Sequence, residues 1–127
     1  MEDISKGVIR VSEELIFFPG YTFNQFKKTR FYNCQDGIKI IYLDEQQIIE
    51  NRRYIVSLFF REGKIYMISL ICCDKEFVEN DERKRKLLHD NILREWGIKM
   101  REEYSWGEIS SDYDVRGNIS SINIKYF

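Results

Sequence analysis

The pair of residues with the clearest chemical potential is His89-Asp90, because metal-dependent phosphohydrolases carry a His-Asp dyad. Such a site needs further histidines, and His89 is the only histidine in the chain. A serine or cysteine triad would also depend on His89 alone, and the sequence has no Gly-x-Ser-x-Gly elbow and no glycine-rich phosphate loop. On a helix, His89 falls between Leu93 and Trp96 in an apolar arc. We therefore predict a half-buried, hydrogen-bonded imidazole, and no metal, cofactor or catalytic residue.

A second group of candidate residues lies in the segment 102–114, which holds five carboxylates and no Lys, Arg or His. Aromatic side chains alternate with these carboxylates. Carboxylates can steer a positively charged partner to a surface while aromatic side chains anchor it. The predicted partner-contact residues are Glu102, Glu103, Glu108, Asp112, Tyr113 and Asp114. The alternative is that this segment only keeps a sheet face soluble, with Trp106 in the core, and nothing marks an acid apart from a base for catalysis.

The basic residues do not form the footprint of a nucleic-acid-binding protein. The run 83–86 directly follows acidic residues at 79, 81 and 82, so a solvated helix face with local ion pairs is the better interpretation. A second cluster, within residues 27–30, is small. The chain has 20 basic and 21 acidic residues, and its net charge of −1 gives no bulk attraction to nucleic acid or anionic lipid. We expect neither as a partner.

The cysteines and the apolar runs point to a cytoplasmic protein. Cys34, Cys72 and Cys73 have no metal-ligand spacing, and their odd number favours free thiols in a reducing compartment. The first residues lack the basic and apolar regions of a secretory signal. Apolar runs such as 65–73 are shorter than the ~20 residues that a membrane span needs.

The elements that position these residues are mostly strands. The segments 54–60 and 65–73 are β-branched and aromatic, and Gly63 between them predicts a tight hairpin. Both faces of these strands are apolar, which is typical of central strands that are covered on both sides. Residues 104–109 and 119–126 read as two more strands around a loop at 114–118.

One long helix is predicted over residues 81–96, where the apolar period changes to 3.6. Asn80 or Asp81 would cap its start, Gly97 would follow its end, and Leu88, Ile92 and Trp96 would face the sheet.

The N-terminal third carries weaker signals. A short strand is predicted at 14–18, Thr22 and Gln25 have the spacing of a capping box, and 31–43 reads as a hairpin around 33–37. The chain of 127 residues contains one proline, and 43% of its residues are hydrophobic. We predict a single α+β domain, 1–127, with a mainly antiparallel sheet of about five to six strands and the helix packed on it.

The C-terminal motif resembles a pattern in small immunity proteins that accompany polymorphic or contact-dependent bacterial toxins. The motif reads Tyr104-x-Trp106-Gly107-x-Ile109-x-Ser111-x-Tyr113-Asp114-x-x-Gly117, followed by Ile122-x-Ile124-x-Tyr126. The segments 18–29 and 86–93 are similar to the early turn-and-helix and to the helix of these proteins, although many relatives have Trp where Ile92 stands. Together these segments cover about half the chain.

This resemblance implies a non-catalytic inhibitor that binds the C-terminal domain of a cognate toxin, often a nuclease, inside the producing cell. It carries no residue-level toxin contact and no oligomeric state. A small enzyme of an unrecognised type and an orphan protein-interaction domain remain the alternatives. The neighbouring upstream reading frame distinguishes them, because a toxin gene favours immunity and a metabolic operon favours an enzyme.

Overall fold

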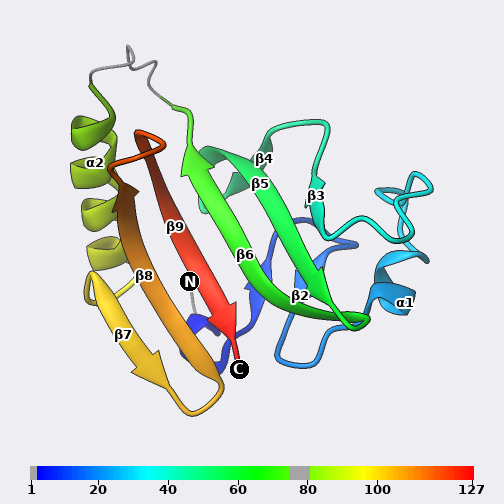
Figure 1. Ribbon diagram of the computed structural model, residues 1–127. Helices are drawn as coiled ribbons and strands as arrows, with labels where there is room; N and C mark the ends of the chain where they lie inside the picture. The colour runs from blue at the N-terminus through cyan, green and yellow to red at the C-terminus, as the bar shows by residue number, and fades with distance from the viewer. Residues whose placement is uncertain (1–2, 75–80) are drawn as a thin grey trace.

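The computed structural model describes residues 3–74 and 81–127, and its central feature is a seven-stranded antiparallel sheet (Figure 1). Six strands follow the order β3-β5-β6-β9-β8-β7, and β4 pairs with β5 beside β3. Their bounds are β3 Ile40–Tyr42, β4 Gln47–Ile49, β5 Arg52–Arg61, β6 Lys64–Cys72, β7 Arg101–Tyr104, β8 Gly107–Asp114 and β9 Ile119–Tyr126. A separate ribbon pairs β1 (Ile9–Arg10) with β2 (Ile16–Phe17), and the helices are α1 (Phe23–Phe26) and α2 (Glu82–Glu95). The predicted α+β class is confirmed, and the short edge strands β3 and β4 bring the sheet above the expected five to six strands.

The hairpin of β5 and β6 forms the middle of the sheet. Its turn residues Glu62 and Gly63 both have positive φ, 54° and 78°, which is the geometry that two-residue hairpins favour. The pairing runs from Tyr54 opposite Cys72 to Arg61 opposite Lys64 and is shifted by a bulge after Phe59. This confirms the predicted hairpin.

Helix α2 packs across β8 and β9 (Figure 1). Ile92 and Leu93 are fully buried, and Leu88 and Trp96 are partly buried against the same core. Gly97 follows the helix with φ 76°, so the predicted C-terminal glycine is confirmed. At the other end, the Asp81 side chain makes no capping hydrogen bond, and the alternative cap Asn80 lies outside the described residues.

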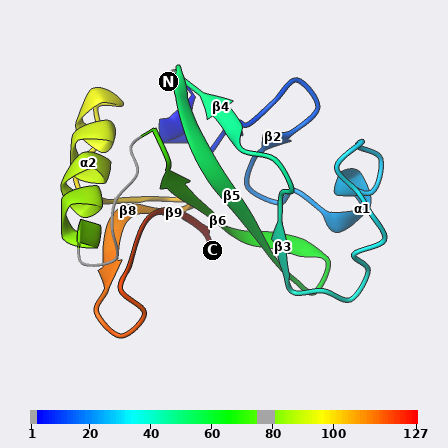
Figure 2. The ribbon, with the colours of Figure 1, turned by 90° about the horizontal axis from the view of Figure 1, so that it is seen from above.

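The N-terminal segment covers the other half of the same sheet face (Figure 2). The capping box of Thr22 and Gln25 is present at the start of α1, which sets Phe26 against Phe60 of β5 with ring centroids 5.9 Å apart. Near the chain start, the Tyr126 hydroxyl donates a hydrogen bond of 2.8 Å to the carbonyl of Gly7. One face of the sheet is therefore covered by α2 and residues 3–38 together.

Two local predictions are wrong. The segment 31–43 is not a hairpin, because only Ile40–Tyr42 forms a strand, and its partner is the long β5 rather than Phe31-Tyr32. Residues 31–38 are instead an irregular loop in which the Asp36 carboxylate contacts both Lys27 and Tyr32. The predicted strand 104–109 is split by a turn at Ser105-Trp106, which separates β7 from β8.

The prediction that β5 and β6 are covered on both faces is also wrong. Tyr54, Val56 and Leu58 are fully buried on one face of β5, whereas Ile55 on the other face is 41% exposed. No described element lies in front of β5, β6, β9 and β8 as they are seen in Figure 1. The sheet therefore presents one face to solvent.

Candidate docking face

We call the side of the seven-stranded sheet opposite α2 and the β1–β2 ribbon the open face. Its residues follow from the strand register, because side chains alternate between the two faces of a strand. Over β7, β8 and β9 the open face is polar, and we call this part the acidic half. Its residues are Arg101, Glu103, Glu108, Ser110, Asp112, Asp114, Ser121, Asn123 and Lys125. Over β3 to β6 it is hydrophobic, and we call this part the apolar half. Its apolar residues are Ile40, Tyr42, Ile48, Ile55, Phe59, Met67 and Ile71, and Arg53, Ser57 and Ser69 lie among them on the same side of the strands.

Asp112 lies at the centre of the acidic half and is held in place from three sides. The Ser110 hydroxyl and the Asn123 amide donate hydrogen bonds of 2.6 and 2.7 Å to Oδ2, and the Arg101 guanidinium lies 3.2 Å from Oδ1. Burial alone would raise the pKa of Asp112, but these two hydrogen bonds, with the charges of Lys125 and Arg101, bring it below its ordinary value. Asp112 is therefore an ionised carboxylate with a fixed position.

Arg101 joins two of the carboxylates. Its guanidinium lies 2.9 Å from a carboxylate oxygen of Glu108 as well as close to Asp112. Glu103 and Asp114 make no ion pair among the described residues. Four carboxylates of the acidic half thus face two cations, Arg101 and Lys125, so the half keeps a local negative charge although the whole chain is nearly neutral.

The structure brings four of the six predicted contact residues together and separates the other two. Glu103, Glu108, Asp112 and Asp114 share the open face, whereas Glu102 and Tyr113 lie opposite Ile109 and Ser120 on the covered side. The Glu102 carboxylate accepts a 2.6 Å hydrogen bond from Tyr104, and the Tyr113 hydroxyl donates one of 2.8 Å to Asn118. The predicted segment 102–114 is therefore not a single contact surface, because strand pleating divides it.

Trp106 does not belong to the open face. Its indole stacks on Tyr104 with ring centroids 5.0 Å apart, and Nε1 donates a 2.8 Å hydrogen bond to the carbonyl of Ser5. The ring lies partly buried against the core. Trp106 thus ties the turn between β7 and β8 to the start of the chain, close to the alternative interpretation that placed it in the core.

His89 is buried on the inner side of α2. The backbone N–H of Cys72 donates a 3.0 Å hydrogen bond to Nε2, so the proton of the neutral ring is on Nδ1. Burial, aided by the charge of Arg85, lowers the pKa of His89 to about 4. The imidazole is therefore hydrogen-bonded as predicted, and it is fully rather than half buried. Among residues 3–74 and 81–127, no three His, Cys, Asp or Glu side chains form a group that can hold a metal ion.

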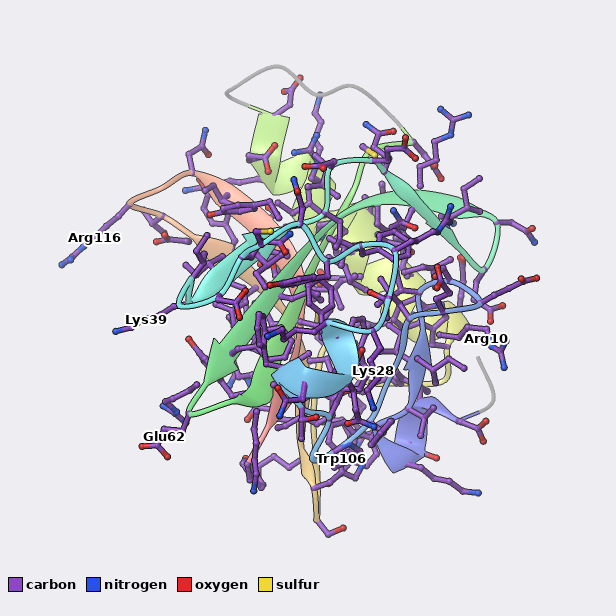
Figure 3. The ribbon with its side chains drawn as sticks, turned by 90° about the vertical axis from the view of Figure 1, so that its right-hand side faces the viewer. Arg10, Lys28, Lys39, Glu62, Trp106 and Arg116 are labelled. Atoms are coloured by element: carbon purple, nitrogen blue, oxygen red, sulfur yellow. The ribbon has the colours of Figure 1, made fainter. Side chains whose placement is uncertain are left out.

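The apolar half was missed as a candidate site. Tyr42 and Ile48 are 65% and 64% exposed, and Ile55 lies beside them. The sequence signal for these exposed residues is that both faces of β5 and β6 are apolar. The same signal predicted that both faces are buried within the chain. Lys39, next to Ile40, and Glu62, at the hairpin turn, project from the body of the protein at the edge of this half (Figure 3).

A surface hollow with a volume of about 380 Å³ lies between residues 30–35 and 42–47. The chain matches no protein-family model, no curated protein and no solved structure. Within the described part of the chain, neither helix is long and apolar enough to span a membrane.

Proposed function

We propose that this protein is a non-catalytic immunity protein that binds and neutralises the C-terminal domain of a cognate bacterial toxin in the cytoplasm. The observation that carries the proposal is the acidic half of the open face, where four carboxylates, two of them held by Arg101, lie beside an exposed hydrophobic surface. The resemblance of the C-terminal motif to immunity proteins supports the same function.

The chemistry of the acidic half fits a toxin that acts on nucleic acid. Such a toxin needs a positive groove for phosphates, and fixed carboxylates can occupy that groove or bind beside it. The hydrogen bonds from Ser110 and Asn123 orient Asp112 before any partner arrives, so binding does not have to order this side chain. The net charge of −1 means that attraction is local rather than spread over the whole protein. We therefore expect the carboxylates to affect the association rate most strongly.

The test uses the toxin domain encoded by the adjacent upstream reading frame and a triple variant, Glu108→Gln, Asp112→Asn and Asp114→Asn. We expect weaker binding, a slower association rate and a smaller dependence of affinity on salt concentration. The matched control is Asp3→Asn, Glu14→Gln and Glu95→Gln, which removes three exposed carboxylates from the N-terminal segment and α2, away from the open face. A folded triple variant that keeps both the affinity and the salt dependence of the wild type places the contact surface elsewhere. A neighbouring operon for metabolism, with no toxin gene, rejects the immunity function itself.

A further inference from the structure

The apolar half of the open face is a mainly hydrophobic surface that extends over four strands, β3 to β6. Register places Ile40 opposite Phe59 and Phe59 opposite Met67, and it places Ile55 opposite Ile71. Ile48 lies on the same face, opposite the charged Arg53. Directly opposite residues in a sheet have Cβ atoms about 5 Å apart, so their side chains form one surface. Contiguous exposed apolar surfaces of this kind mark interaction sites in soluble proteins.

A row of polar side chains crosses the strands from the apolar half into the acidic half. Ser57, Ser69, Asn123 and Ser110 lie opposite one another on β5, β6, β9 and β8. Because the serine side chains are short, the surface is low along this row, and a partner that lies along it reaches residues of both halves. One partner can therefore contact both halves at once.

We propose that the apolar half is the anchor of a protein-docking surface whose occupant is the toxin domain, bound through an apolar patch bordered by basic side chains. This inference rests on the proposed function and adds to it the surface that supplies most of the binding energy. In protein complexes, a few well-buried apolar and aromatic side chains dominate affinity, while charges at the rim mainly set the association rate. Tyr42 and Ile48, with about two thirds of their surfaces exposed, are the side chains with most to bury.

Charge complementarity selects this occupant over others. In the acidic half four carboxylates face two cations, so this part of the surface repels nucleic acid and anionic lipid and attracts basic side chains, whereas the apolar half carries Arg53. A second copy of this chain that packed its apolar half on the first would leave the acidic half without an oppositely charged partner. A protein that presents hydrophobic and basic groups side by side can pack on the apolar half and pair its charges with the acidic half.

The experiment compares Ile48→Ser and Tyr42→Ser with Leu87→Ser, using the toxin domain of the upstream reading frame as the probe. Leu87 lies on α2 and is 63% exposed, almost the same as Ile48 at 64%, so it controls for the loss of an exposed aliphatic side chain. We expect about a tenfold or greater loss of affinity for Ile48→Ser and for Tyr42→Ser, and no change for Leu87→Ser. The loss should appear as faster dissociation and should be the same at low and high salt, in contrast to the loss from the carboxylate variant.

The outcomes separate this inference from the proposed function. If the wild-type protein does not bind the toxin domain, both fail. If it binds, and folded Ile48→Ser and Tyr42→Ser retain wild-type affinity while the carboxylate variant loses it, the apolar anchor is wrong and the immunity function stands. Sedimentation of the wild type alone completes the test, because a dimer that Ile48→Ser converts to monomer assigns the apolar half to a second copy and overturns the inference. Two variants at different strands, β4 and β3, keep the test decisive if one of them misfolds.

Discussion

Replacing His89 with Gln should change how the stability of the protein depends on pH. In the folded protein, the neutral imidazole accepts the Cys72 N–H at Nε2 and is fully buried beneath α2. Its pKa falls from the ordinary value of 6.5 to about 4, first because burial disfavours the charged ring and then because Arg85 is nearby. A Gln side chain can still accept the Cys72 hydrogen bond, but it does not titrate.

The magnitude follows from the two pKa values. Between pH 6.5 and about 4, the unfolded chain binds a proton on His89 that the folded chain does not bind. The free energy of unfolding therefore keeps its full value with respect to His89 above pH 6.5, and it falls as the pH is lowered through this range. At 1.36 kcal/mol for each pH unit, the wild type should lose roughly 3 kcal/mol on this account. At pH 7, His89→Gln should itself be less stable by about 1–3 kcal/mol, because a packed and hydrogen-bonded group has been replaced.

The two stability curves should therefore approach each other as the pH falls. The measurement is urea unfolding followed by tryptophan fluorescence at pH 7, 6, 5 and 4 for both proteins. Carboxylates contribute equally to the two curves, so the difference between them isolates His89. Curves that stay parallel over this pH range would refute the assignment of a buried, neutral imidazole. Toxin binding at pH 7 should survive in folded His89→Gln, and a loss of function in the fully folded variant would point to a catalytic histidine instead.

Two further predictions concern the core and are measured by the same unfolding experiment. Gly107→Ala should destabilise the protein by about 3 kcal/mol, because an added Cβ would lie 1.8 Å from the backbone oxygen of Lys125 on β9. A loss of stability below about 0.5 kcal/mol would contradict the β8–β9 register. Ile92→Ala should cost about 2–5 kcal/mol because Ile92 is fully buried, whereas Leu87→Ala on the exposed side of the same helix should stay within about 0.5 kcal/mol. Equal effects of the two helix variants would show that α2 packs through a different face.

The parts of the fold that could be predicted from the sequence are those set by local signals. The 3.6 period ending at Gly97 identifies α2, and Gly63 between two β-branched runs identifies the central hairpin. The capping box at Thr22 is equally local. The hairpin predicted at 31–43 failed because Ile40–Tyr42 pairs with β5, almost twenty residues further along the chain, and no short-range pattern encodes that choice of partner.

The candidate site was half predictable for a similar reason. The carboxylates of 102–114 were identified by composition, but their division between two faces depends on where β8 begins. The turn at Ser105-Trp106 fixes that start, and with it Asp112 faces outward and Tyr113 faces the helix. Arg101, which joins Glu108 and Asp112, lies just before the segment, so the composition of 102–114 does not include it.

The outward apolar residues of β3, β4 and β5 are not needed for folding and are available for binding. The core is complete without them, because α2 and the N-terminal segment already cover the inner face, where Val56 and Leu58 are fully buried. Exposed residues such as Ile48 contribute little to the free energy of folding, and their replacement typically changes it by no more than about 0.5 kcal/mol. Hydrophobic pattern alone does not show whether a face is covered by the same chain or by another one. For β5 and β6 the chain covers one face only. On the proposed function, the apolar residues of the second face are there to contact the partner.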